Sequence, residues 1–254
     1  MKRAMMAGVA ALACAGARAE VVQVEILGTV DYNVYASGPF AGVPSGAPAA
    51  LRFQVDSNNF LNSASFPTRG YVITQASFTF QAGAASTTLY SPFPAGQTPY
   101  FVLRNNDPAV DGFFISMGTD FPAPLPLQYN ANAGMNFLVT YGGTTLNSLD
   151  ILSAVGTYTF AGISVFDWRI SVGPGDPMGM IFDTITISVL PAPCYANCDG
   201  STAAPILNVN DFSCFLNLYA AGSVLANCDA STVAPVLNVN DFSCFLNKFA
   251  AGCP

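Results

Sequence analysis

The stretch Asn197–Gly222 reads NCDGSTAAPILNVNDFSCFLNLYAAG, and it returns 30 residues later as Asn227–Gly252, NCDASTVAPVLNVNDFSCFLNKFAAG. Of the 26 aligned positions, 21 are identical. Repeats of this length mark structural units that bury their apolar faces against one another. The sequence therefore predicts that the chain ends in one small domain built from two equivalent halves.

Each copy predicts a polar loop followed by a helix. Phe212, Phe215, Leu216 and Tyr219 are spaced i, i+3, i+4 and i+7, which is one face of an amphipathic helix. Gly222 is a typical residue to end such a helix. The second copy repeats the pattern with Phe242, Phe245, Leu246 and Phe249.

Cysteines are confined to this end of the mature chain. Residues 20–190 contain none, whereas the last 61 residues contain Cys194, Cys198, Cys214, Cys228, Cys244 and Cys253. An even number in a short, exported segment predicts a disulfide framework. Symmetry allows pairing within each repeat (198–214 and 228–244) or crossed pairing (198–244 and 214–228). The within-repeat pairing closes shorter loops and is favoured, with Cys194 and Cys253 then joining the two ends of the domain.

Residues 194–254 resemble the dockerin family, and in particular the GC-type dockerin domains that end many exported bacterial proteins. Three motifs carry the resemblance, each present twice: Asn-Cys-Asp-(Gly/Ala)-Ser, Leu-Asn-Val-Asn-Asp-Phe-Ser-Cys-Phe-Leu-Asn and Ala-Ala-Gly. The resemblance implies two loop–helix halves, each similar to the second half of an EF-hand and each holding calcium. It also implies a docking partner, a cohesin-like or other cell-surface protein. By analogy the first calcium ligands would be Asn197, Asp199, Ser201, a carbonyl near Ile206, Asn208 and Asp211. The second set would be Asn227, Asp229, Ser231, a carbonyl near Val236, Asn238 and Asp241.

The loops depart from the usual calcium pattern. The first and last ligands of a standard loop lie 11 residues apart, but Asn197 and Asp211 are separated by 14. The extra residues fall in Thr202–Pro205, where the usual turn glycine is missing. Only two carboxylates serve each loop, so we expect weak calcium binding of the extracellular type. The alternative is that the loops have lost calcium and the disulfides hold the domain.

The first 19 residues have the features of a signal peptide. Lys2 and Arg3 precede a short apolar run, and Ala17-Arg18-Ala19 fits the signal-peptidase pattern, so the mature chain is expected to begin at Glu20. A lipoprotein with Cys14 as the lipidated residue is the less favoured variant. No apolar run reaches the roughly 20 residues that a transmembrane helix needs. We therefore expect a secreted or cell-surface protein without a transmembrane segment.

Composition narrows the function classes. Cleavage would leave five basic residues against 15 acidic ones, a net charge of about −10, which argues against nucleic acid as a partner. The chain has no histidine, so Ser-His-Asp triads, Cys-His pairs and histidine metal sites are excluded. Glutamate occurs only at Glu20 and Glu25. These absences favour a protein that is not an enzyme.

Residues 20–190 predict a second, larger domain made of β-strands. Alternating apolar and polar residues, as in Ile185–Val189, are typical of half-buried antiparallel strands. The expected strands are 21–29, 50–55, 71–80, 100–104, 112–117, 135–141, 157–172 and 178–189, separated by Gly/Pro/Asn/Asp turns. We expect a jelly-roll-like antiparallel β-sandwich, followed by a linker at residues 191–193 and the small disulfide-rich α domain at 194–254.

Two main functions are consistent with this plan. The first is an exported, non-catalytic attachment protein whose sandwich is tethered by the dockerin-like tail. The second is a carbohydrate-binding or carbohydrate-active protein anchored by the same tail, with polysaccharide bound by exposed aromatic rings of the sandwich. The single tryptophan, Trp168, shares a strand face with Phe166 and Ile170, a pattern typical of core packing. A self-assembling surface structure, a third class, would show exposed edge strands.

Overall fold

The computed structural model describes residues 19–115, 120–121, 125–191 and 194–253. Most of the predicted signal peptide, Cys14 with it, lies outside these ranges, as do residues 192–193 of the predicted linker and the end of the strand expected at 112–117. The chain divides into two compact units between Leu190 and Pro191. Within the described ranges, no helix is both long and apolar enough to cross a membrane.

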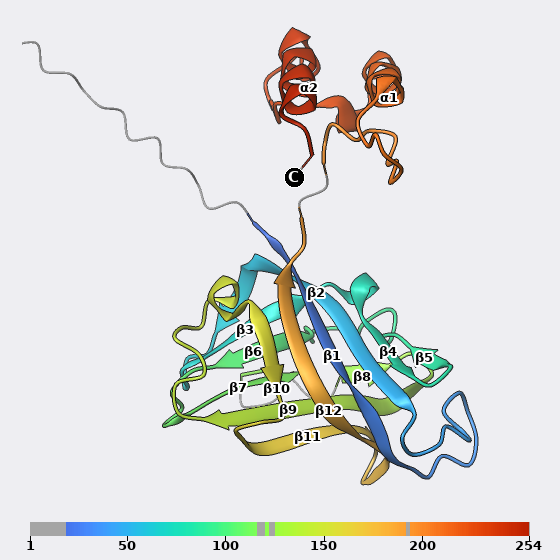
Figure 1. The fold of residues 1–254 in the computed structure, drawn as a ribbon, viewed down its shortest axis with the longest axis vertical. Helices are drawn as coiled ribbons and strands as arrows, with labels where there is room; N and C mark the ends of the chain where they lie inside the picture. Colours follow the sequence, from blue (N-terminus) through green and yellow to red (C-terminus); the bar gives the residue numbers. More distant parts are fainter. Residues whose placement is uncertain (1–18, 116–119, 122–124, 192–193, 254) are drawn as a thin grey trace, which may run out of the picture. The chain divides into compact units, whose positions relative to one another are not determined.

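The first unit, here called the β unit, is a twisted antiparallel sheet (Figure 1) with one large core and a small separate cluster of Val102, Phe114 and Phe121. Its strands are β1 (Val21–Asn33), β2 (Pro48–Asn62), β3 (Thr68–Ile73), β4 (Thr79–Ala82), β5 (Ala85–Thr87), β6 (Tyr100–Arg104), β7 (Val110–Ile115), β8 (Leu125–Leu127), β9 (Asn130–Gly142), β10 (Gly156–Thr159), β11 (Ile163–Val172) and β12 (Gly175–Val189). Two short 3-10 helices, η1 (Gln75–Ser77) and η2 (Ile151–Ala154), lie between strands.

The expected fold class is confirmed: the chain is mainly β, its sheet is antiparallel, and two helices follow near its end. The main strands pair in the order β1-β12-β11-β9-β7-β6-β3-β2, and β2 pairs with β1 again. Strands that follow one another in the sequence are therefore mostly neighbours in the sheet. This meander differs in connectivity from the Greek keys that a jelly roll would have.

Alternation builds the core of the β unit. In β1 every second residue from Val22 to Ile26 is fully buried, as a strand with one face inward requires. Trp168 is 2% exposed and packs edge-on against Phe80 and Phe137. The prediction that Trp168 is a core residue is confirmed.

A bulge explains why the alternation of β12 holds only from Ile185 onward. The pairing of β1 with β12 shifts between Leu27 and Gly28, whose partners are Thr184 and Phe182. A side-chain carbon at Gly28 would lie 2.0 Å from the carbonyl oxygen of Ile181, so only glycine fits there. The shift moves the buried positions of β12 from even to odd residues.

Two expected strands are each interrupted. The strand expected at 71–80 is β3 and β4 with η1 between them, and the one expected at 157–172 is β10 and β11. Residues 160–162 leave the sheet between β10 and β11 because β10 pairs with β12, whereas most of β11 pairs with β9. Alternation records which side chains are apolar and not which strand is the partner, so it does not show where the pairing changes.

The second unit begins at Pro191, and its residues 194–254, here called the tail, contain α1 (Val209–Ala220), the 3-10 helix η3 (Val224–Ala226) and α2 (Val239–Ala251). Its core is centred on Phe215 and Phe245, whose rings stack with centroids 4.2 Å apart. Around them the ring centroids of Phe212 and Phe245 lie 6.0 Å apart, and those of Phe215 and Phe242 lie 6.1 Å apart. This reciprocal arrangement is expected of two equivalent halves.

Three disulfides join the tail: Cys198–Cys214, Cys228–Cys244 and Cys194–Cys253. The structure thus has the within-repeat pairing, with a third disulfide between the ends of the tail.

One prediction about the helices was wrong, because Leu216 and Leu246 are each 41% exposed and do not pack in the core.

Candidate functional site

The last carboxylate of each predicted calcium loop is fully buried. Asp211 and Asp241 are 0% exposed and occupy the first turns of α1 and α2. The Oδ1 atom of Asp211 accepts a hydrogen bond from the Asp199 amide at 3.2 Å, and its Oδ2 atom accepts one from the Asn208 amide at 2.8 Å. In the second repeat the corresponding distances, from Asp229 and Asn238 to Asp241, are 3.3 and 2.8 Å.

These contacts govern the charge state of Asp211. Burial alone would raise its pKa, but the backbone amides of Asn208, Asp199 and Cys198 donate to it and hold the pKa below its usual value. The pKa of Asp241 is lowered in the same way. Each tail helix therefore begins with a buried, ionised carboxylate.

The start of each loop is held by its own side chains. Asp199 Oδ1 accepts the Ser201 amide at 2.9 Å, and Asn197 donates from Nδ2 to the Ser201 carbonyl at 2.9 Å. The second loop has the same bonds from Asp229 and Asn227, also at 2.9 Å. Both loops thus form compact turns around their serine.

Asn208 and Asn238 cap the helices. Each accepts the amide two residues later, Asn210 or Asn240, at 2.8 Å, and a capping box with Asp211 or Asp241 completes the helix start. Ile206 and Val236, whose carbonyls were predicted ligands, lie just before these caps with exposed side chains. The structure therefore brings the beginning and the end of each predicted ligand set together through Asp211 and Asp241.

This arrangement is a poor fit to calcium, which requires six to eight oxygen ligands. Two features favour a cation: the carboxyls of Asp199 and Asp211 contact each other, and Asn197 Oδ1 is buried without a hydrogen-bond partner. Against it, backbone amides already donate to Asp199, Asn208 and both oxygens of Asp211. Among the described residues no three His, Cys, Asp or Glu side chains are grouped as a metal site. Calcium binding stays a prediction, tested below.

Comparison with known proteins yields no relative: no family model, no curated protein and no solved structure matches this chain. The candidate site therefore rests on the geometry of the chain itself.

The repeats also match in what they expose. Val209 and Val239, at the starts of the two helices, are 73% and 71% exposed. The outward-facing Leu216 and Leu246 are each 41% exposed, and Ile206 and Val236 are 41% and 37% exposed. Sequence reasoning assigned the leucines to the core and did not consider the valines. The sequence does contain a signal for the exposed valines, because each is an apolar residue at the first position of its helix and lies outside the face predicted to be buried.

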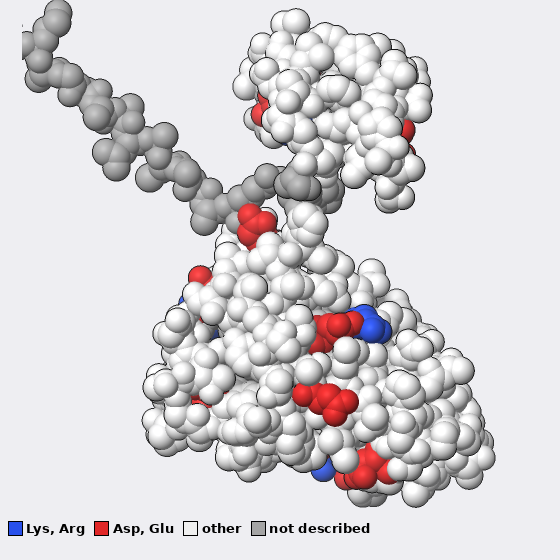
Figure 2. Space-filling view, in the orientation of Figure 1, with Lys and Arg blue, Asp and Glu red and all other residues white. Residues whose placement is uncertain are grey.

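The β unit offers fewer candidate binding residues than the tail. Trp168 is buried, and of the described tyrosines only Tyr32 is classed as exposed, at 41%. The exposed aromatic platform expected of a polysaccharide binder is thus not formed by Trp168 or by a group of exposed tyrosines. Figure 2 shows a surface with few charged side chains on the face in view.

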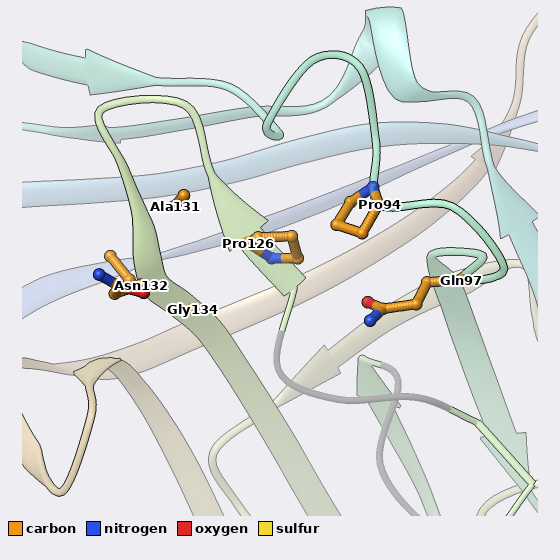
Figure 3. A pocket seen from close by; sticks show the side chains of 7 residues that line it. Pro94, Gln97, Pro126, Ala131, Asn132 and Gly134 are labelled. Atoms are coloured by element: carbon orange, nitrogen blue, oxygen red, sulfur yellow. The ribbon is translucent and has the colours of Figure 1, made fainter.

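A hollow of about 240 Å³ lies beside the turn between β8 and β9 (Figure 3). Two prolines, Pro94 and Pro126, and the amide side chains of Gln97 and Asn132 line it together with the backbone of residues 131–134. None of these side chains titrates near neutral pH, so the hollow has no acid, base or charged group of its own.

Asp111 is the third fully buried aspartate of the described chain. Its Oδ1 accepts the Asn106 amide at 2.8 Å and its Oδ2 the Leu146 amide at 2.7 Å. Asp111 thus joins the loop before β7 to the loop after β9.

Proposed function

We propose that this chain is an exported, non-catalytic attachment protein whose tail binds a protein partner at the cell surface or outside the cell. The supporting observation is the duplicated set of exposed apolar side chains: Ile206, Val209 and Leu216, and Val236, Val239 and Leu246. These residues are outside the buried cluster of the tail. Contiguous exposed apolar patches mark binding surfaces, whereas scattered apolar residues are ordinary, so the support here is that the same set is exposed in both copies.

The dockerin resemblance supports the class of partner, a cohesin-like or other cell-surface protein. The resemblance was read from the repeat motifs, and the exposed residues lie within or next to them. Val209 and Leu216 belong to the conserved block of the two copies, so the repeat preserves this surface along with the core. The absence of histidine supports a role without acid–base catalysis.

A capture experiment with the full chain tests the proposal. The wild type and the double variant Leu216→Ser, Leu246→Ser are immobilised and exposed to an envelope extract of the producing cell. Both leucines are partly exposed, so the helical circular dichroism of the variant is expected to match that of the wild type. A partner protein retained by the wild type is expected to be lost or strongly reduced with the variant.

Val224→Ser is the matched control, because Val224 is 81% exposed but lies on η3 and occurs only once. This control is expected to retain the partner. If the wild type and the leucine variant capture the same proteins in equal amounts, the repeated surface is not the binding surface and the proposal fails.

A further inference from the structure

We propose that the buried carboxylates of Asp211 and Asp241 hold the two loops of the tail in the place that a metal ion would take, so that the tail folds without calcium. This inference concerns how the tail is held together and does not depend on the proposed partner.

The geometry of each carboxylate is that of a bridge. Asp211 accepts the amide of Asp199 at the start of the loop and the amide of Asn208 at its end. It therefore ties together two points nine residues apart in the sequence while itself belonging to α1. A calcium ion in an EF-hand-like loop does the same work by gathering oxygens from both ends of the loop.

The same bridge occurs in both repeats. Asp241 joins the amides of Asp229 and Asn238 with distances within 0.1 Å of those in the first repeat. Conservation of the bridge across two copies that differ at five of 26 positions indicates that it belongs to the repeat as a unit.

The β unit uses the same device where no metal is expected. Asp111 is equally buried and joins the amides of Asn106 and Leu146, 40 residues apart, with distances of 2.8 and 2.7 Å. A buried carboxylate that accepts two backbone amides thus occurs in this chain outside the predicted calcium loops as well.

The local charges favour a carboxylate over a cation at the centre of the loop. Backbone N–H groups present their positive ends to Asp211, and a cation at the same point would face those donors. The disulfide Cys198–Cys214 adds a covalent tie between the residue before Asp199 and α1. In the second loop Asn227 Oδ1 also accepts the Ser231 amide at 3.0 Å, so that loop closes with its own donors.

Thermal unfolding of the full chain with its disulfides intact tests this inference. Helices α1 and α2 are the only α-helices of the described chain, and the single tryptophan lies in the β unit. Circular dichroism at 222 nm therefore follows the tail, and tryptophan fluorescence follows the β unit. The wild-type tail is expected to melt at the same temperature in chelator and in about 10 mM calcium, beyond the weak extracellular range.

Two matched double variants separate the two roles of the aspartates. Asp211→Asn with Asp241→Asn replaces one acceptor oxygen in each bridge by a donor, and it is expected to lower the melting temperature in chelator by at least about 5 °C. Asp199→Asn with Asp229→Asn changes two predicted calcium ligands but keeps the oxygens that accept the Ser201 and Ser231 amides, so it is expected to lower that temperature by less than the first double variant does.

A calcium site would give the opposite pattern. The wild type would melt higher in calcium than in chelator, and the Asp211 and Asp241 variant would lose that rise while melting normally in chelator. Either result overturns the inference. Should the variant fail to fold, calorimetric titration of the wild type with calcium chloride decides: no heat of binding up to about 10 mM supports the inference, and saturable binding overturns it.

Discussion

The β unit and the tail are stable for different reasons. The β unit has a continuous core of phenylalanine, valine, isoleucine and methionine side chains and no cysteine. The tail has four buried residues at its core, among them Phe215 and Phe245, and three disulfides. A short chain buries a smaller share of its surface than a long one, so it needs covalent links where the larger unit relies on apolar burial. Chain length, more than composition, separates the two units.

The largest expected difference appears on reduction. Treatment with a phosphine reductant is expected to abolish the helical signal of the tail, because each disulfide contributes about 2–4 kcal/mol and the core is too small to compensate. The fluorescence of Trp168 is expected to stay unchanged, since residues 20–190 contain no cysteine. Loss of the tryptophan signal on reduction would show that the β unit depends on the tail and would break the comparison.

The reverse perturbation is a cavity in the β unit. Trp168→Ala is expected to destabilise that unit by roughly 3–5 kcal/mol, because the side chain is buried between Phe80 and Phe137. Urea unfolding followed by the β signal in circular dichroism measures this loss, and the helical transition of the tail should not move. Val165→Ala, at a residue 53% exposed on the same strand, is the control and should change little. An effect of Trp168→Ala below about 1 kcal/mol would contradict its role in the core.

Alkaline pH should also weaken the β unit. Burial, with a smaller contribution from Tyr158, raises the pKa of Tyr141 to about 12, and its hydroxyl donates to the Thr159 carbonyl at 2.9 Å. The unfolded phenol ionises near pH 10, so the stability that the neutral phenol contributes is complete below pH 10 and is lost between pH 10 and 12. The variant Tyr141→Phe is expected to lose less stability than the wild type between pH 10 and 12. Melting of the β unit at pH 9 and pH 11 measures it, and equal pH dependence of variant and wild type would rule Tyr141 out as a source.

The smallest expected effect compares the two repeats directly. Gly200 has φ +69° and its equivalent Ala230 has φ +56°, a left-handed backbone that alanine adopts at a cost. Ala230→Gly is expected to stabilise the tail by about 0.5–1 kcal/mol, and Gly200→Ala to destabilise it by a similar amount. Helical melting of the two variants measures both. Changes of the same sign would show that the two loops are not held alike.

Much of the local structure followed from the sequence. Spacing of Phe212, Phe215 and Tyr219 predicted α1, Gly222 predicted its end, and period-two alternation predicted most strands, because side-chain burial repeats with the period of the backbone. The repeat symmetry limited the disulfides to two schemes, and the shorter loops favoured the pairing that the structure has. These inferences rest on contacts between residues close in the sequence.

Contacts between distant residues were decided by the tertiary structure. The shift in β12 depends on Gly28 meeting the carbonyl of Ile181, which no local pattern encodes. The outward position of Leu216 depends on how α1 packs, since Leu218 and not Leu216 joins Phe215 at the core of the tail. The sequence predicts Asp211 as a metal ligand, and this stays a prediction, but which groups surround its oxygens depends on how the chain folds. In this fold those groups are backbone amides, whose N–H dipoles stabilise the carboxylate directly.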